Sequence, residues 1–287
     1  MTDAKVSRLA CLAPAKLNLF LHVVGRRADG YHLLQTVFRL IDFSDQLNFV
    51  LRHDGTVKLL SPIPGVPEDT DLCVRAARLL QQESGVSSGV DILLEKRIPM
   101  GGGLGGGSSD AATTLLALNR LWGLNWPRDR LIQLGVKLGA DVPVFIFGKS
   151  AFAEGIGEKL VPIDLPPAWY LVLTPSAQVP TAQVFGSKEL TRNTIPIKIP
   201  PFSVEHGHND LEPVVCRLYP EVARCLEWLK QLDSPRMAAM TGSGACVFAE
   251  FAAEPTARAA LSQLPSDMCG FVARGLDHHP LHDFVEQ

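Results

Sequence analysis

The chain has 287 residues, enough for one large domain or two modest ones, and its 46% hydrophobic and 20% charged residues are typical of a globular protein with a buried core. A formal net charge of −3 gives no support for nucleic-acid binding. The six cysteines are scattered without a C-x-x-C pair, and polar residues interrupt the first apolar run, so we expect reduced thiols, no signal peptide, no membrane span and a cytoplasmic location.

The first predicted element is a strand at residues 16–24. Leu17 and Leu19 share the face expected to point into the core, whereas Lys16 and Asn18 share the other face. Lysine on a strand is often a solvated edge residue, so this segment alone leaves open whether that second face meets solvent or a functional site.

Two further strand-like runs follow, at residues 33–42 and 45–51, and the pair Asp54-Gly55 predicts a hairpin turn. Thr70 is the expected N-cap of a helix that stops at Gly85. The opening part of the chain is therefore predicted to be β-rich and then helical.

A glycine-rich loop comes next, with six glycines in the seven positions from Gly101 to Gly107, between a predicted strand at 90–95 and a predicted helix at 109–122. Backbone N–H groups of a loop without Cβ atoms can approach a ligand closely. The helix N-terminus adds unpaired N–H donors and the positive end of the helix dipole. This order of elements predicts a phosphate-binding site.

Three other interpretations of this loop fit less well. A Walker A loop needs Gly-Lys-Ser/Thr, but Gly107 is followed by Ser108 and the loop contains no lysine. A dinucleotide-binding loop would need an acidic residue about 20 residues further on, and residues 118–127 contain none. A flexible linker is seldom placed between an apolar strand and an apolar-periodic helix.

After a predicted helix at about 127–139, Asp141 stands between the helix end and an apolar segment, where it could be a cap or a functional acid. Residues 151–161 predict a small hairpin, and the prolines that follow mark an expected domain boundary between residues 165 and 166. The second half repeats strands and helices, with one long helix broken near Pro220, and predicts an α/β sandwich with helices on one face of a sheet.

Three separated segments together resemble one family, the GHMP kinases: Pro14-Ala-Lys16-Leu-Asn18, the stretch from Pro99 to Asp110, and Thr241-Gly-Ser-Gly-Ala-Cys-Val-Phe248. Their order and spacing span nearly the whole chain. The resemblance implies an α+β, two-domain GHMP kinase fold. Residues 1–165 would form a ribosomal protein S5 domain 2-like, ATP-binding and catalytic N-terminal domain, and residues 166–287 a ferredoxin-like α/β sandwich that binds substrate.

The resemblance also implies ATP-dependent phosphorylation of an alcohol, with ATP and Mg²⁺ as cofactors. Lys16 and Asp141 are the expected catalytic pair, and a carboxylate is a poor base toward an alcohol, so Asp141 would orient the hydroxyl and accept its proton late. Mg²⁺ would bridge the phosphates, with Ser108, Ser109 or a water completing its shell. The ATP-binding residues would be Pro99, Met100, Gly101, Gly102, Gly103, Leu104, Gly105, Gly106, Gly107, Ser108 and Ser109.

Within the family, Arg26-Arg27 and Asp29-Gly-Tyr-His32 resemble the branch whose substrate is a cytidine diphosphate-linked methylerythritol. Tyr31 and Phe185 would then stack on the cytosine and His32 would bond its edge. The expected substrate-binding residues are Asn18, Tyr31, His32, Thr181 and Phe185. The expected partners are this small molecule and at most a second copy in a weak homodimer, with no nucleic acid and no membrane.

Other functions stay open. The chain could be a homoserine- or mevalonate-type kinase, a non-catalytic ATP-binding relative, or a dinucleotide oxidoreductase. Retention of Lys16 and Asp141 argues against the non-catalytic relative. The tail histidines His278, His279 and His282 resemble metal ligands only loosely, and we expect them to be exposed tail residues.

Overall fold

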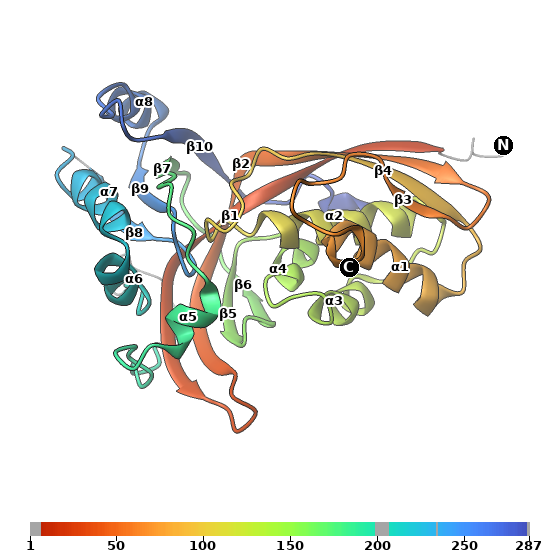
Figure 1. Ribbon diagram of the computed structural model, residues 1–287, viewed down its shortest axis with the longest axis horizontal. Helices are drawn as coiled ribbons and strands as arrows, with labels where there is room; N and C mark the ends of the chain where they lie inside the picture. The colour runs from red at the N-terminus through yellow and green to blue at the C-terminus, as the bar shows by residue number, and fades with distance from the viewer. Residues whose placement is uncertain (1–6, 199–206, 234, 286–287) are drawn as a thin grey trace.

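A computed structural model describes residues 7–198, 207–233 and 235–285. Its longest elements are β1 (Arg8–Arg26) and β2 (His32–Arg52), which pair in antiparallel fashion along nearly their full length. They run through the whole molecule, and their connecting turn projects away from its body (Figure 1). The two strand-like runs expected at 33–42 and 45–51 are thus one continuous strand, because β1 supplies a partner along both.

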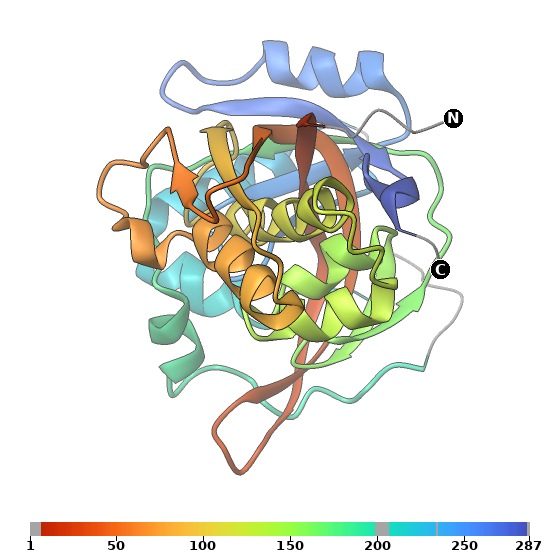
Figure 2. The same ribbon diagram turned by 90° about the vertical axis from the view of Figure 1, so that its right-hand side faces the viewer.

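The first half of the chain packs four helices on one face of a sheet. The sheet order is β3 (Val57–Leu59), β4 (Gly89–Glu95), β2 and then β10 (Gly270–Leu276). Strands β1 and β5 (Ala151–Gly155) also pair with β2, and β6 (Lys159–Pro162) pairs with β5. The helices lie together on one side of this sheet (Figure 2). They are α1 (Leu72–Ser84), α2 (Gly106–Leu121), α3 (Arg128–Val136) and α4 (Val142–Phe147).

Helix α2 is the centre of this half. Most of its residues are buried, and Leu115 and Leu118 share one apolar cluster with Leu47 and Phe49 of β2. An apolar helix that is covered on nearly all sides cannot shift easily within a closely packed core. The glycine loop that precedes α2 is therefore attached to a fixed point.

Two local expectations are wrong. Asp54-Gly55 does not make a hairpin, since β3 leaves β2 and pairs in parallel with β4. Thr70 does not cap α1, because Asp71 lies closer to the helix start and its Oδ1 accepts from the N–H of Cys73 at 2.8 Å. Gly85 does end this helix, in the left-handed conformation expected there.

The second half is a ferredoxin-like sandwich. Its strands are β7 (Trp169–Leu173), β8 (Met237–Met240), β9 (Val247–Phe251) and β10 (Gly270–Leu276), in the order β10-β7-β9-β8. Helices α6 (Glu212–Leu218), α7 (Pro220–Lys230) and α8 (Glu254–Ser262) cover one face, and the short α5 (Thr181–Gly186) lies beside the β1–β2 hairpin (Figure 1). Pro220 opens α7, which confirms the break expected in the long helix.

The two halves meet through the other face of the second sheet. Tyr170 and Phe248 on that face share an apolar cluster with Leu17 of β1 and Leu104 of the glycine loop. The sheets also join directly, since β10 pairs with β2 at two positions, Gly275 with Ile41 and Leu276 with Leu40. The division between residues 165 and 166 stays a prediction. None of the helices in the described part of the chain is long and apolar enough to span a bilayer.

Candidate active site

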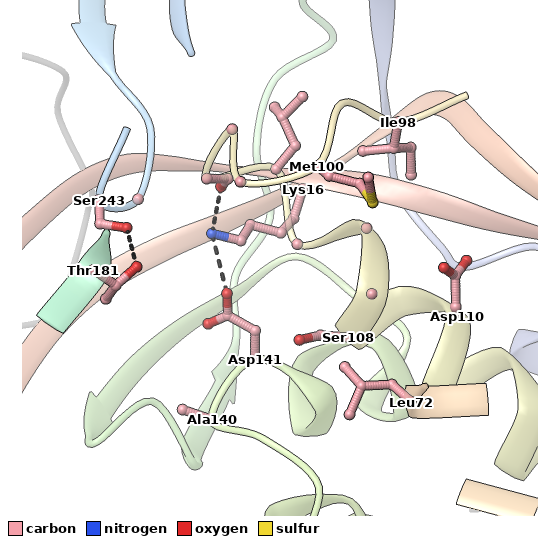
Figure 3. Close-up of a pocket in the computed structure, with 18 of the residues that line it drawn as sticks. Lys16, Leu72, Ile98, Met100, Ser108, Asp110, Ala140, Asp141, Thr181 and Ser243 are labelled. Carbon is pink, nitrogen blue, oxygen red and sulfur yellow. Dashed lines mark hydrogen bonds and ion pairs between the residues drawn. The ribbon is translucent and has the colours of Figure 1, made fainter. Parts of the chain in front are cut away.

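A cleft of about 600 Å³ opens where the two halves meet. The long strands β1 and β2 form its back, and the glycine loop with the first turn of α2 forms one wall. The segment before α4 lies opposite, and α5 and the turn at 241–244 close one end. Segments that are far apart in the sequence therefore share one cavity (Figure 3).

The glycine loop needs glycine at two places for different reasons. Gly105 has φ +72° and stands just before α2, whose first turn receives no hydrogen bond from a capping side chain. A Cβ at Gly103, which has φ +76°, would lie 2.3 Å from the carbonyl oxygen of Thr241. The loop thus fits closely against the second half and leaves the first N–H groups of α2 free for an anion.

Lys16 is buried, with 2% of its side chain exposed, and its ammonium has three oxygen partners. The Nζ atom donates to the Gly103 carbonyl at 2.8 Å and to Asn18 Oδ1 at 2.5 Å, and it lies 3.3 Å from Asp141 Oδ2. Figure 3 shows it between the glycine loop and Asp141. The face of β1 that carries Lys16 and Asn18 therefore lines the cleft. The alternation pattern alone had left open whether this face meets solvent or a functional site.

Asp141 reaches the cleft because α4 starts immediately after it. Residues 137–141 link α3 to α4, and Ala140 and Asp141 line the cavity. The Asp141 side chain is 35% exposed, so its second oxygen can meet a ligand while the first faces Lys16. This carboxylate is a structural neighbour of β1 although 125 residues separate the two in the sequence.

The segment at residues 241–248, the third of the family pattern, is hydrogen-bonded to the other two segments. Thr241 Oγ1 accepts from the backbone N–H of Asn18 at 2.9 Å, and the Cys246 N–H donates to the Gly102 carbonyl at 3.1 Å. Asn209 is buried below this turn and donates to the carbonyls of Met240 and Gly242. These bonds hold the β8–β9 turn against the loop and against β1.

Sequence reasoning missed a buried charge cluster beneath the loop. Lys96 bridges Asp45 on β2 and Asp110 on α2, with 2.8 Å between Lys96 Nζ and Asp110 Oδ2. Asp45 Oδ1 also accepts the backbone N–H groups of Arg97 and Ile98, where the chain enters the loop. Burial raises the pKa of the Asp110 carboxyl to about 7, against the opposing effect of the Lys96 ammonium. The cluster ties both ends of the loop to the core, and only Asp110, in the Ser-Ser-Asp sequence, gave any signal of it.

Aromatic and polar side chains gather at the end of the cleft near α5. Phe185 and Thr181 line it, and the Thr181 hydroxyl lies 2.7 Å from that of Ser243. The His32 ring packs on Phe185 with ring centres 4.9 Å apart. Tyr31 is 61% exposed on the β1–β2 turn and does not line the cleft.

The cleft brings together most of the expected site residues. Lys16, Asn18, Asp141, Thr181, Phe185 and every position from Pro99 to Ser108 line it. His32 lies behind Phe185 rather than in the lining. Ser109 is turned away, because its buried hydroxyl donates to the Pro14 carbonyl at 2.6 Å.

The expectation of an exposed histidine tail is wrong for His279. Its ring is 2% exposed, Nδ1 accepts from the Leu281 N–H, and Nε2 lies 3.4 Å from Thr113 Oγ1. Burial lowers its pKa to about 3. Within the described ranges no group of three or more His, Cys, Asp or Glu side chains could hold a metal ion. Through its contact with Thr113, His279 anchors the C-terminal segment to α2.

A glycine loop at a helix N-terminus, facing a lysine–aspartate pair across a cleft between two α/β halves, defines a kinase for small molecules. The models for the GHMP kinases N terminal domain and the GHMP kinases C terminal match residues 71–149 and 203–269. This chain belongs to the GHMP kinase family, whose members use ATP.

Curated relatives match along the whole chain. A 4-diphosphocytidyl-2-C-methyl-D-erythritol kinase of Nitrosospira multiformis is 75% identical over 281 residues, which cover 98% of this chain and 96% of the relative. The protein of the same name from Nitrosomonas europaea is 65% identical over 273 residues, 95% of this chain and 98% of the relative.

Solved structures agree with the fold. A crystal structure of 4-(cytidine 5'-diphospho)-2C-methyl-D-erythritol kinase is 36% identical with a TM-score of 0.79, over 93% of this chain and 99% of that one. A homoserine kinase from Cytophaga hutchinsonii is 16% identical with a TM-score of 0.70, over 97% of this chain and 98% of that one, which shows a shared fold alone.

Proposed function

We propose that this chain transfers the γ-phosphoryl group of ATP to the 2-hydroxyl of 4-diphosphocytidyl-2-C-methyl-D-erythritol, in the methylerythritol phosphate route to isoprenoid precursors. The products are the 2-phosphate and ADP. The observation that carries the proposal is the Lys16–Asp141 pair opposite the glycine loop, in a chain up to 75% identical to kinases named for this substrate.

The glycine loop and the first turn of α2 would hold the phosphates of ATP. A Cβ at Gly101 would meet nothing within 4 Å, so this part of the loop borders open space. Beyond it, Ile63, Val66 and Leu72 line the cleft with Met100, which is 63% exposed. An apolar end next to a phosphate site suits the flat faces of an adenine.

Lys16 and Asp141 would act on the acceptor hydroxyl. The free oxygen of Asp141 can accept a hydrogen bond from the hydroxyl and so aim its oxygen at the phosphorus. The Lys16 ammonium is held by three oxygens, so it can stabilise negative charge between the alcohol and the γ-phosphate without having to reorganise. In a loose transition state this positioning matters more than early proton removal, and Asp141 would take the proton late.

The donors beside the phosphate site fit Mg²⁺. The ion usually keeps several waters and binds through phosphates with one or two protein ligands. Ser108 lines the cleft at the start of α2 and Asp141 stands opposite, whereas the Ser109 hydroxyl is committed to Pro14. When bound, Mg²⁺ would neutralise charge on the β- and γ-phosphates, and of the two serines we assign Ser108 to its shell.

The α5 end of the cleft would bind the cytidine. Phe185 offers a ring face and Thr181 a hydroxyl. Asn18 lines the same cleft beside Lys16, whose ammonium donates to its Oδ1, so it would border the reacting end of the substrate. Tyr31, 61% exposed on the β1–β2 turn, would cover the second face of the base. His32 would bond the base edge. A cytoplasmic location and a monomeric or weakly dimeric state remain predictions.

An ADP-release assay across candidate alcohols tests the function. The panel contains the cytidyl substrate, methylerythritol phosphate without the nucleotide, homoserine and mevalonate, each with ATP and Mg²⁺. We expect turnover with the cytidyl substrate to exceed that with the others by at least about 100-fold, because a lost remote group also lowers turnover. Preferred turnover of homoserine or mevalonate would replace the proposed substrate. ADP release from none of the four, with ATP still bound in calorimetry, would favour the non-catalytic relative.

A further inference from the structure

Arg192 contacts the histidine that the proposed function assigns to the base edge. Its Nε–H donates to Nε2 of His32 at 3.1 Å. The remaining guanidinium nitrogens donate to backbone carbonyls at the end of α5 and just after it, to Leu190 at 3.1 Å, Phe185 at 2.8 Å and Ser187 at 2.7 Å. Four hydrogen bonds in a planar fork fix the direction of the Nε–H bond.

A guanidinium is donor-only and keeps its proton at every pH a protein meets. The nitrogen that accepts from it, Nε2 of His32, must therefore present its lone pair. In a neutral imidazole the proton then sits on Nδ1, and no described side chain or backbone group bonds that nitrogen. His32 is thus set to donate from Nδ1.

The surroundings also disfavour a charged ring. Burial lowers the pKa of His32, and the positive charges of Arg192 and Arg26 lower it further. The α5 neighbour of the ring is Phe185, which carries no charge. The imidazole therefore stays neutral, with one defined tautomer, at neutral pH.

A His32 ring with one defined tautomer can distinguish cytosine from uracil by the hydrogen bond that it makes to N3 of the base. Cytosine presents an unprotonated N3, which accepts a hydrogen bond, whereas uracil presents N3–H, which donates one. We propose that Arg192 is a positioning residue that holds His32 as the Nδ1–H tautomer and thereby makes the site select cytosine over uracil. This inference rests on the proposed function, because it assumes that a cytidine nucleotide reaches His32.

The selectivity is measured as the ratio of kcat/KM for the cytidyl substrate to kcat/KM for its uridine diphosphate counterpart. In wild type, the Nδ1–H of His32 would face the N3–H of uracil, so two donors would be left without an acceptor. In Arg192→Met the ring can adopt either tautomer, and we expect the ratio to fall by roughly 10- to 100-fold. Phe185→Leu is the control. It removes stacking that both bases share, so both values should fall and the ratio should stay near that of wild type.

A pH series separates tautomer control from a displaced loop. An imidazolium donates from both nitrogens, so in Arg192→Met the lost preference for cytosine should return as the pH falls from 8 toward about 5.5, through the ordinary range of histidine. The wild-type ratio should stay level. If Arg192→Met only displaces the loop that Arg192 ties to Phe185, kcat/KM should change by the same factor for both substrates, and their ratio should not depend on pH. That outcome overturns the proposal.

The tautomer can also be observed without any loop variant. In full-length protein with ¹⁵N-labelled histidine, assigned by comparison with His32→Gln, His32 should show the shifts of a neutral ring protonated on Nδ1. A ring protonated on Nε2 overturns the proposal even where Arg192→Met fails to fold. Absence of turnover with the cytidyl substrate in wild type instead refutes the proposed function, and the spectrum distinguishes the two failures.

Discussion

Lys16 Nζ and Asp141 Oδ2 lie 3.3 Å apart, and the same ammonium donates to the Gly103 carbonyl of the glycine loop. One buried cation therefore links the glycine-loop wall of the cleft to the carboxylate on the opposite wall. In the proposed function, its position would fix where the acceptor hydroxyl and the γ-phosphate meet. The first prediction tests the carboxylate of this pair.

Asp141→Asn should lower turnover by about 10²-fold or more, because the amide cannot accept the proton of the hydroxyl. ATP affinity should be largely kept, since the glycine loop and α2 are unchanged. Steady-state kinetics measure the first effect and calorimetry with ATP the second. Turnover near that of wild type would remove Asp141 from the mechanism.

Gly106→Val should abolish ATP binding while the protein stays folded. A Cβ at Gly106 would lie 3.0 Å from Ile98 Cγ2 and 3.1 Å from Lys96 Nζ, so the valine methyls would displace the loop where it enters α2. Calorimetry measures ATP affinity, and circular dichroism checks the fold.

The matched control is Gly186→Ala, where an added Cβ meets nothing within 4 Å and φ is not positive. Its ATP affinity should equal that of wild type. Unchanged affinity in folded Gly106→Val would place the nucleotide elsewhere in the molecule.

Tyr31→Ala should reduce kcat/KM for the cytidyl substrate by roughly 1–3 kcal/mol of transition-state binding, the value of one stacked base. Tyr31 is 61% exposed, so its removal should not affect folding or ATP affinity. The comparison uses methylerythritol phosphate without the nucleotide on both proteins. An unaltered ratio between the two substrates would show that Tyr31 does not contact the base.

Asp110→Asn should remove a pH dependence of stability. The folded carboxyl titrates at about 7, above the value near 4 of an unfolded aspartate. Between these values the folded state binds more protons, so the free energy of unfolding of the wild type should fall as the pH rises through this window, by at most about 1.4 kcal/mol per pH unit.

Chemical denaturation of both proteins from about pH 5 to 8 measures this difference. The wild type should lose stability relative to Asp110→Asn as the pH rises, and the difference should level off above pH 7. Parallel stability profiles would show that the Asp110 carboxyl does not titrate in this range.

Local sequence determined the parts of this protein whose physics is local. The run from Gly101 to Gly107 between a strand and an apolar helix predicted a phosphate loop, and the structure places that run on a cleft wall before α2. Pro220 marked a helix boundary because its ring cannot continue a preceding helix. Alternation in β1 defined two faces but could not tell which molecules or segments the second face meets.

Tertiary structure decided every relationship that depends on distant partners. The pair Asp54-Gly55 is typical of a hairpin turn, yet β3 pairs in parallel with β4. No local sequence pattern encodes this pairing. Lys96 helps to anchor the glycine loop only because Asp45 and Asp110 converge on it, and Arg192 contacts His32 across 160 residues of chain. Packing overrides local preference at such places, since a buried charge or donor is stable only beside the partner that the fold brings to it.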